Sequence, residues 1–508
     1  MSVTLEDLGI AYRKAKVDLY YSSNASLPAI AEYESTIGDN LRALHERLNG
    51  DDEDWVKANT FIGGWTLAPK SIEKPHGEGA GNSLIFSSPT DEWKHLCKKA
   101  ENEKSAQKPI AEFRLMADAS LDFHVLSALW MLKVGHQYDA KLTDSAYGNR
   151  LRRNKDKGIN SLSLGSFSPY LKPFRTWRDN GINTMRAALA SEKKVVALTA
   201  DVSAFYHELN PDFMLDVRFN NLLELTLSPS EQNLHRLFIT ALQAWAQNTP
   251  LKKGLPVGLP ASAVVANLAL IELDRLVEQQ VAPLYYGRYV DDILLVMENG
   301  ASFGSTVELW QWLFDRSGGK LSWVQGTEQQ EIQFQPLYLD NSKIRFTNKK
   351  NKVFLLEGET GKTLVDSIAH QIHERASEWR ALPNLPRSAS HVATDLVAAT
   401  QSDGEAADNL RKANALTMRR AGFAIKLRDL EAYERDLPPA AWAEHRHAFF
   451  YAFIQHVLVL PHFFELAIYL PRVVRLVTAC EDFEHLRKII HGLDPYRYTQ
   501  LEQARLTC

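Results

Sequence analysis

The chain has 508 residues, of which 45% are hydrophobic and 24% are charged, and its net charge is −4. Its length allows two or three domains, and the composition is ordinary for a globular protein. A membrane-spanning protein is excluded because no apolar run is long enough to cross a bilayer, and the N-terminus lacks the pattern of a signal peptide. We therefore expect a cytoplasmic protein.

The three cysteines, Cys97, Cys480 and Cys508, lie far apart and predict neither a disulfide framework nor a zinc-dependent appendage. The slightly acidic charge also opposes an extended grip on duplex nucleic acid, which usually requires a basic protein. One local segment, residues 141–178, interleaves aromatic side chains with cations. These cations are Arg150, Arg152, Arg153, Lys155, Lys157, Lys172, Arg175 and Arg178. The segment is either a solvated basic face or a local nucleic-acid contact.

In chain order, residues 1–110 have the pattern of helices separated by polar loops, with helical periodicity at 11–21 and 29–48. Residues 111–362 alternate between strand and helix patterns. Residues 363–508 show repeated helical periodicity, as at 416–434 and 442–458. We therefore expect an α+β protein with an N-terminal helical part, a central catalytic part and an all-α C-terminal domain.

The first candidate motif is the segment Lys194–Tyr206, in which an apolar strand ends at Asp201 and a helix with two aromatic residues follows. A carboxylate at the end of a strand faces a cleft, although such an aspartate can also simply cap the next helix. The segment therefore supplies one candidate metal ligand.

The second motif is the segment 285–296, YYGRYVDDILLV, which predicts a β-hairpin with Asp291 and Asp292 at its tip. Adjacent like charges repel, and a metal ion is the usual reason to tolerate them, whereas in an exposed turn both carboxylates are simply hydrated. Between the two motifs, the glycine-rich loop 254–262 precedes a helix expected at 263–280. Two-metal nucleotidyl transfer needs Mg²⁺ ions roughly 4 Å apart, held by carboxylates from separate segments.

The order of a strand aspartate, a Gly-Pro loop with its helix, and a Tyr-Val-Asp-Asp hairpin resembles motifs A, B and C of a polymerase palm. The hairpin resembles that of reverse transcriptases, and the resemblance covers roughly residues 110–360. It implies a right-hand fingers and palm fold in which Asp201, Asp291 and Asp292 are catalytic metal ligands, assisted by the Val202 carbonyl. It also implies two Mg²⁺ ions, with Mn²⁺ as an alternative.

The same resemblance implies further roles in nucleotide binding. Tyr206 matches the aromatic residue that excludes a 2′-hydroxyl, so the substrates would be deoxynucleoside triphosphates; Phe205 and Gly258 would line the same site. Residues 147–151 and 169–175 resemble the fingers of defence-associated bacterial reverse transcriptases, with Arg150 and Arg152 as triphosphate contacts. Lys343 matches the motif D lysine, and a surface lysine is the alternative.

One position departs from the family pattern. Reverse transcriptases usually carry glutamine after the proline of motif B, where this chain has Val257, whose side chain cannot form a hydrogen bond. The all-α C-terminal part resembles the abortive-infection (Abi) polymerases of bacterial phage defence, in which HEAT-like helical repeats replace the thumb and DNA synthesis is protein-primed and untemplated. That resemblance implies a bacterial homo-oligomer, a trimer or hexamer, and a single-stranded DNA product attached to the protein.

A protein primer needs a hydroxyl that reaches the metals, and the candidates are Tyr12, Tyr20, Tyr21 and Tyr33 in the N-terminal helices. Nothing in their spacing chooses among them, and each is also interpretable as a packing aromatic.

Two other patterns are rejected as sites. Residues 358–363 lack the first glycine of a phosphate loop, since that position is Leu356. A set of histidines in apolar helices has no nearby cysteine or carboxylate partner, so we expect no metal there. The set is His445, His447, His456 and His462.

Two other functions remain open. One is a conventional RNA-templated reverse transcriptase of retron or intron-like type. The other is a catalytically idle, polymerase-derived scaffold that binds nucleic acid. An Asp291→Ala substitution separates enzyme from scaffold.

Overall fold

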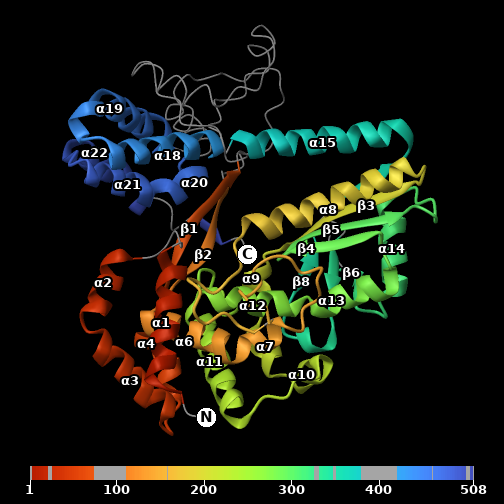
Figure 1. Cartoon of the computed structure of the whole chain (residues 1–508), viewed down its shortest axis with the longest axis horizontal. Helices are drawn as coiled ribbons and strands as arrows, with labels where there is room; N and C mark the ends of the chain where they lie inside the picture. The colour runs from red at the N-terminus through yellow and green to blue at the C-terminus, as the bar shows by residue number, and fades with distance from the viewer. Residues whose placement is uncertain are drawn as a thin grey trace, which may run out of the picture. The chain divides into compact units, whose positions relative to one another are not determined.

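The computed structural model describes residues 3–20, 26–73, 110–156, 158–324, 331–346, 351–378, 420–459, 462–498 and 504–506. The chain divides into two compact units (Figure 1). The first unit comprises residues 1–66 and 115–373, and the second comprises residues 67–114 and 374–507. This division differs from the three predicted parts, because the N-terminal helices fall within the same unit as the catalytic motifs.

The first unit begins with short helices that pack against its interior. These are α1 (Leu5–Tyr20), α2 (Leu27–Ser35), α3 (Ile37–Asn49), η1 (Asp54–Lys57) and α4 (Asn59–Ile62). The single helix predicted at 29–48 is broken at Thr36, whose φ of −129° and ψ of 28° end α2 and start α3. Helix α1 packs against α6 (Leu121–Trp130), and Ser120 caps α6 by accepting a hydrogen bond from the Phe123 N–H.

An antiparallel sheet forms the centre of the first unit. Its strands are β3 (Val195–Ser203), β4 (Tyr285–Tyr289), β5 (Asp292–Glu298), β6 (Leu321–Trp323), β7 (Ile332–Phe334), β8 (Ile344–Phe346) and β9 (Lys352–Leu356). The strand order is β4-β5-β3-β8-β7-β6, and β9 also pairs with β3. The apolar side chains of strand β3 are buried, which agrees with the apolar run in its sequence. The predicted strand and hairpin are therefore confirmed.

Helices cover this sheet and connect its strands. They are η2 (Met131–Gly135), α7 (His136–Asp139), α8 (Leu171–Ala190), α9 (Phe205–Glu208), η3 (Pro211–Leu215), α10 (Val217–Leu223), α11 (Pro229–Asn248), α12 (Pro260–Ala269), α13 (Ile271–Leu276), η4 (Val277–Val281), α14 (Thr306–Arg316), η5 (Leu337–Leu339) and α15 (Gly358–Glu378). Helix α8 lies across β3, β4 and β5 (Figure 1). Its Gly181 allows close packing, since a Cβ there would lie 2.3 Å from Leu294.

The second unit combines a small sheet with helices. The sheet has the order β1-β2-β10, formed by β1 (Gly64–Glu73), β2 (Ile110–Asp118) and β10 (Ala504–Leu506). The helices are α18 (Arg420–Asp436), η6 (Pro439–Trp442), α19 (Ala443–Ala452), η7 (Phe453–Val457), α20 (His462–Leu466), η8 (Ala467–Tyr469), α21 (Leu470–Ala479) and α22 (Phe483–Tyr498). Phe113 of β2 joins Phe423, Phe449 and Val473 in one apolar core. The helical character of the C-terminal region is thus present, whereas HEAT-like repeats stay a prediction.

Strand β1 corrects the expectation of an all-helical N-terminal part. Its sequence contains Pro69 and follows Gly63-Gly64, which locally oppose a strand. Pairing with β2, more than thirty residues further along the chain, stabilises it instead. None of the described helices is long and apolar enough to span a membrane.

Candidate active site

Strands β3 and β5 bring two predicted carboxylates together. The strands pair antiparallel, with Asp201 directly opposite Asp292. Directly opposed residues share one face of a sheet, with Cβ atoms about 5 Å apart. Asp291 lies in the turn just before β5, and its carbonyl accepts a hydrogen bond from the Val202 N–H at 3.4 Å. All the residues predicted to hold metal therefore meet at one end of the β3–β5 pair.

The tip of the β4–β5 hairpin has a strained backbone. Val290 has a φ of 61°, a region that β-branched residues rarely adopt. Gly148 lies against this turn, since a Cβ there would come within 2.8 Å of the Val290 backbone nitrogen. Strain of this kind costs about 1–3 kcal/mol and persists only where neighbouring contacts enforce it.

Arg288 of β4 supplies one such contact. Its side chain is fully buried, and Nη1 donates to the Val290 carbonyl at 3.1 Å and to Asn267 Oδ1 at 2.7 Å. Nε and Nη2 donate to the buried carboxylate of Asp274, and Nη2 also donates to the Asn267 carbonyl. All five N–H groups of the guanidinium are thereby satisfied.

The Arg288 network extends to the segment before α8. Asn267 Nδ2 donates to the Gly148 carbonyl at 2.7 Å, and the Tyr147 N–H donates to the Arg288 carbonyl at 2.9 Å. The Arg288 N–H in turn donates to the Ser145 carbonyl at 2.8 Å. Motif B, motif C and residues 145–149 are therefore joined through one buried side chain, whose importance no local sequence pattern signals.

Tyr206 lies in α9, directly after the motif A strand. It is half-buried, and burial together with the charge of Asp291 raises its pKa well above the usual range for tyrosine, whereas a hydrogen bond with Asn149 lowers it. The neutral phenol therefore lies beside one predicted metal ligand. Phe205, its neighbour, is buried, and its ring lies edge-on to the Tyr206 ring, with the two ring centroids 6.0 Å apart. Phe205 thus packs in the core behind Tyr206.

The glycine-rich loop of motif B docks on α9. The Leu255 N–H donates to the Tyr206 carbonyl at 2.6 Å, and a Cβ on Gly254 would lie 3.0 Å from the His207 backbone. Gly254 and Gly258 have φ values of 97° and 105°, which favour glycine. Gly258 is exposed, and its neighbour Val257 accepts a hydrogen bond from the Ala117 N–H at 2.8 Å.

The two arginines predicted to contact triphosphate differ in their surroundings. Arg150 turns inward: Nε donates to Asp139 Oδ1 at 3.1 Å, and Nη1 donates to the carbonyls of Thr143 and Ala146. Arg153 binds the other oxygen of the same buried carboxylate at 3.0 Å. Asp139 therefore holds Arg150 and Arg153 in ion pairs within the fold. This pairing disfavours a triphosphate contact for Arg150. Arg152 is half-buried, and its backbone pairs with Ser166 and Asn160.

Lys343 is exposed, and its N–H donates to the Glu208 carbonyl at 3.1 Å, so its backbone adjoins the end of α9. Glu208 also forms an ion pair with Lys253 at 2.6 Å, which ties the motif B loop to the same helix. The backbone of Lys343, the predicted motif D lysine, thus lies next to α9, the helix that follows motif A. No sequence pattern indicated the Glu208–Lys253 ion pair, whose residues lie 45 positions apart.

The residues at the β3–β5 end fit the divalent metal that the resemblance implies. Asp201, Asp291, Asp292 and the Val202 carbonyl offer oxygen atoms alone, the ligand type that Mg²⁺ takes in proteins. When bound there, Mg²⁺ would stabilise the attacking hydroxyl and the leaving pyrophosphate.

The candidate priming tyrosines fall into different environments. Tyr12 is buried and stacks on Tyr33, with ring centroids 5.5 Å apart. The Tyr33 hydroxyl donates to Asp122 at 2.7 Å. Burial raises the pKa of both phenols, and the charge of Asp122 adds to this at Tyr33. Tyr20, at the end of α1, is 65% exposed; Tyr21 lies outside the described residues.

Comparison with known proteins bears on this site. Residues 133–324 match the family model described as reverse transcriptase (RNA-dependent DNA polymerase). No match is found among curated proteins. Among solved structures, telomerase from Candida albicans in complex with a fragment of telomeric RNA matches with a TM-score of 0.26 at 12% identity. The match covers 76% of this chain and 61% of the telomerase chain, so this chain spans about three fifths of that chain's length. The chain therefore contains a reverse-transcriptase-like polymerase domain, which includes all three motifs.

Proposed function

We propose that this chain is a DNA polymerase of reverse-transcriptase type whose synthesis is protein-primed and template-independent, and that it acts in abortive-infection defence against phage. The observation that carries the polymerase part is the register of β3 and β5, which sets Asp201 opposite Asp292 with Asp291 in the adjoining turn. Clustered carboxylates of this kind repel one another, and a bound metal ion is the usual reason to tolerate them. Deoxynucleoside triphosphates are the proposed substrates, and two Mg²⁺ ions the proposed cofactors.

The chain's own residues perform the positioning. Tyr206 presents a ring beside Asp291, where it would meet the sugar of a bound nucleotide and exclude a 2′-hydroxyl. Asn149 holds the Tyr206 hydroxyl, and the motif B loop holds its carbonyl. A ring fixed on both sides discriminates between sugars by contact alone, because it cannot move aside at low cost.

Two features support untemplated synthesis. Val257 occupies the motif B position at which a hydrogen-bonding side chain would help hold a template. In the described helices of the second unit, several cations pair with neighbouring carboxylates, as Arg472 does with Glu431 and Lys488 with Glu484, which leaves fewer cations for phosphate contacts. Defence against phage and assembly as a homo-oligomer follow from the resemblance to Abi polymerases.

The test is incorporation of labelled deoxynucleotides by the purified protein with Mg²⁺ and without template or primer. We expect label that remains with the protein on a denaturing gel until protease is added. Asp291→Asn should lower incorporation by about 10³-fold or more, because the loss of a metal ligand removes charge stabilisation from the reaction. Asp315→Asn, an acidic residue on the surface of α14, is the matched control.

A conventional RNA-templated polymerase is the second candidate, because the matching family model is described as RNA-dependent. It predicts no product until an RNA template and a primer are supplied, and a product complementary to that template. Such a result would exclude the protein-primed proposal while preserving the polymerase. A scaffold would instead retain its biological effect in Asp291→Asn.

The priming residue is tested in the same assay. Because Tyr12 and Tyr33 are packed and their deprotonation is disfavoured, we propose Tyr20 or Tyr21 as the primer. Phenylalanine at the priming position should abolish the protein-linked label and leave the melting temperature unchanged. Tyr33→Phe is the matched control, and linkage mapped by mass spectrometry to Tyr33 would contradict the assignment.

A further inference from the structure

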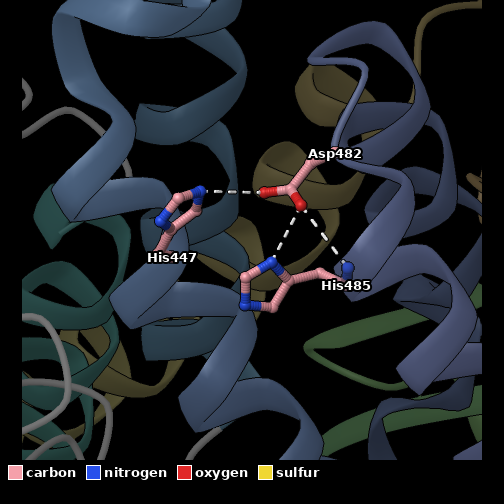
Figure 2. A group of neighbouring side chains, drawn as sticks. All are labelled: His447, Asp482 and His485. Carbon is pink, nitrogen blue, oxygen red and sulfur yellow. Dashed lines mark hydrogen bonds and ion pairs between the residues drawn. The ribbon is translucent and has the colours of Figure 1, made fainter.

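The second unit contains a cluster of potential metal ligands remote in sequence from the polymerase motifs. In the part of the chain that the structure describes, His447, Asp482 and His485 form a group whose ligand atoms all lie within 4.8 Å of one another. His447 comes from α19, His485 lies in the first turn of α22, and Asp482 directly precedes α22. Figure 2 shows the Asp482 carboxylate between the two imidazoles, with all three side chains turned toward one another.

Each imidazole contacts a different oxygen of the Asp482 carboxylate. His447 Nε2 lies 3.3 Å from Asp482 Oδ2, and His485 Nδ1 lies 2.9 Å from Asp482 Oδ1. Two ligand atoms that are each about 2.1 Å from one Zn²⁺ ion are about 3.4 Å apart at the tetrahedral angle. The ligand atoms all lie within 4.8 Å of one another, so side-chain rotation would bring one atom of each residue to a common ion. An imidazole nitrogen that faces a carboxylate oxygen needs either a proton or a metal ion between them.

The surroundings hold the carboxylate in place. Arg446 Nε donates to Asp482 Oδ2 at 3.3 Å, and Arg446 Nη1 donates to the Pro439 carbonyl at 2.6 Å. The His485 N–H donates to Asp482 Oδ1 at 3.4 Å, so Asp482 also caps α22. Metal-ligating carboxylates commonly have outer partners of this kind. The Arg446 charge also repels a cation, which weakens the expected affinity for a metal ion.

Exposure differs across the cluster and indicates an open coordination position. The Asp482 side chain is 7% exposed, whereas the His447 side chain is 52% exposed. Water can therefore complete the coordination on the His447 side. Two imidazoles and one carboxylate suit zinc and related transition metals, whereas Mg²⁺ prefers oxygen ligands alone.

We propose that His447, Asp482 and His485 bind one transition-metal ion of the zinc class, which fastens α19 to the start of α22. The site is separate from the polymerase proposal and does not depend on it. The sequence predicted no metal at His447 because Asp482, its carboxylate partner, lies 35 residues further along the chain. Cys480, which lies in the described part of the chain, is not a member of this group.

The experiment is titration of the metal-free full-length protein with Zn²⁺ by calorimetry, in buffer with millimolar Mg²⁺ to occupy the oxygen-ligand site. Co²⁺ is added separately, because its visible absorption reports tetrahedral ligation by nitrogen and oxygen. We expect about one equivalent of Zn²⁺ and a rise of several degrees in the melting temperature of the second unit.

His447→Gln and Asp482→Asn should weaken Zn²⁺ binding by at least about tenfold. His447 is exposed and Asn can still cap α22, so both variants should fold, which circular dichroism verifies. His445→Gln, on the same helix, is the matched control and should bind as the wild type does. The absence of Zn²⁺ binding, or binding that both variants retain in full, would overturn the proposal and leave a hydrogen-bonded cluster.

Discussion

The Tyr206 ring is confined by contacts from three segments. Asn149 bonds its hydroxyl, the Leu255 N–H bonds its carbonyl, and the buried Phe205 packs beside it. Because these contacts fix both ends of the residue, we propose that the shape of the ring, rather than its hydroxyl, would carry the proposed selection of deoxynucleotides.

This attribution predicts opposite results for two substitutions. Tyr206→Phe keeps the ring and should keep the preference for deoxynucleotides within a few-fold. Tyr206→Val removes the ring and should raise ribonucleotide incorporation relative to deoxynucleotide incorporation by about 10²-fold, the order expected when a site loses one close steric contact of a few kcal/mol. The measurement is the ratio of incorporation for matched ribo- and deoxynucleotides. Equal ratios in the two variants would contradict a steric role.

The buried His235 of α11 makes the stability of the fold depend on pH. Its Nδ1 accepts a hydrogen bond from Trp130 Nε1 at 3.1 Å, and its Nε2 lies 2.9 Å from the Met214 carbonyl. The neutral tautomer with hydrogen on Nε2 satisfies both partners, whereas a proton on Nδ1 would displace Trp130. Burial lowers the pKa of His235 to about 4, although the bond with Met214 opposes this shift.

The lowered pKa predicts acid sensitivity in a defined window. Between pH 6.5 and about 4 the unfolded histidine takes up a proton that the folded one does not, so unfolding becomes easier as pH falls. The contribution at pH 4 is up to about 3 kcal/mol for the full shift. Urea unfolding of His235→Gln should therefore show a flatter pH dependence across that window than the wild type. His45→Gln on α3 is the control, and equal slopes in wild type and His235→Gln would contradict the prediction.

The motifs were predictable residue by residue because their chemistry is local. Asp201, Asp291 and Asp292 each sit at a recognisable strand end or turn, and the structure brings these segments together. Asp139 and Arg288 were not predictable, because their partners lie in other elements of the chain. The sequence predicted that Arg150 contacts a triphosphate for the same reason, because its partner Asp139 is not evident from a local pattern.

Among whole elements, the β4–β5 hairpin depends most clearly on a distant contact. The Val290 backbone at its tip is strained, and Arg288 holds it through the Val290 carbonyl while Asp274 neutralises the guanidinium. The Tyr286 hydroxyl also donates to Asp274 at 2.8 Å. Burial and the Asp274 charge raise the pKa of Tyr286, which keeps the phenol a donor.

We predict that Arg288→Met destabilises the first unit by about 3–5 kcal/mol, because Asp274 would be left buried and unpaired. Adding Asp274→Leu should restore much of this stability, since no buried charge remains. Polymerase activity should stay low in the double variant because the Val290 carbonyl has still lost its donor. Melting temperature and incorporation rate measure the two effects separately. Recovery of both together would show that Arg288 has only a structural role.

Elements with strong local patterns were predicted well, and those that depend on remote partners were not. The hairpin and the motif A strand follow from periodicity and turn chemistry. The helix predicted at 11–21 is present as α1, but it begins earlier, at Leu5. Strand β1 was missed because its sequence opposes a strand and its partner β2 lies far along the chain. The predicted helix from 416 begins at Arg420 in the structure, and residues 416–419 lie outside the described part.

At the scale of the whole chain, the net charge argues against an extended electrostatic grip on nucleic acid. Its net charge is −4, and Asp139 binds two of the cations in its most basic segment. Binding to nucleic acid through phosphates releases counterions, so the logarithm of the binding constant falls with the logarithm of salt concentration by about 0.7 for each phosphate neutralised on a single strand. The number of cations available for such contacts therefore sets the salt dependence.

From this charge distribution we predict weak binding to a supplied RNA–DNA hybrid, with a salt slope shallower than about −3. At about 0.9 for each phosphate neutralised on a duplex, this slope corresponds to roughly three phosphates. Protein-linked synthesis should change little over the same salt range, because a covalently held strand does not need to be recaptured. Fluorescence anisotropy with labelled hybrid and the incorporation assay test both points on one preparation. Lys172→Gln, at an exposed cation of α8, should make the slope shallower by about one contact if that helix supplies the local binding surface. Tight hybrid binding with a steep slope, together with synthesis that fails as salt rises, would favour the RNA-templated alternative.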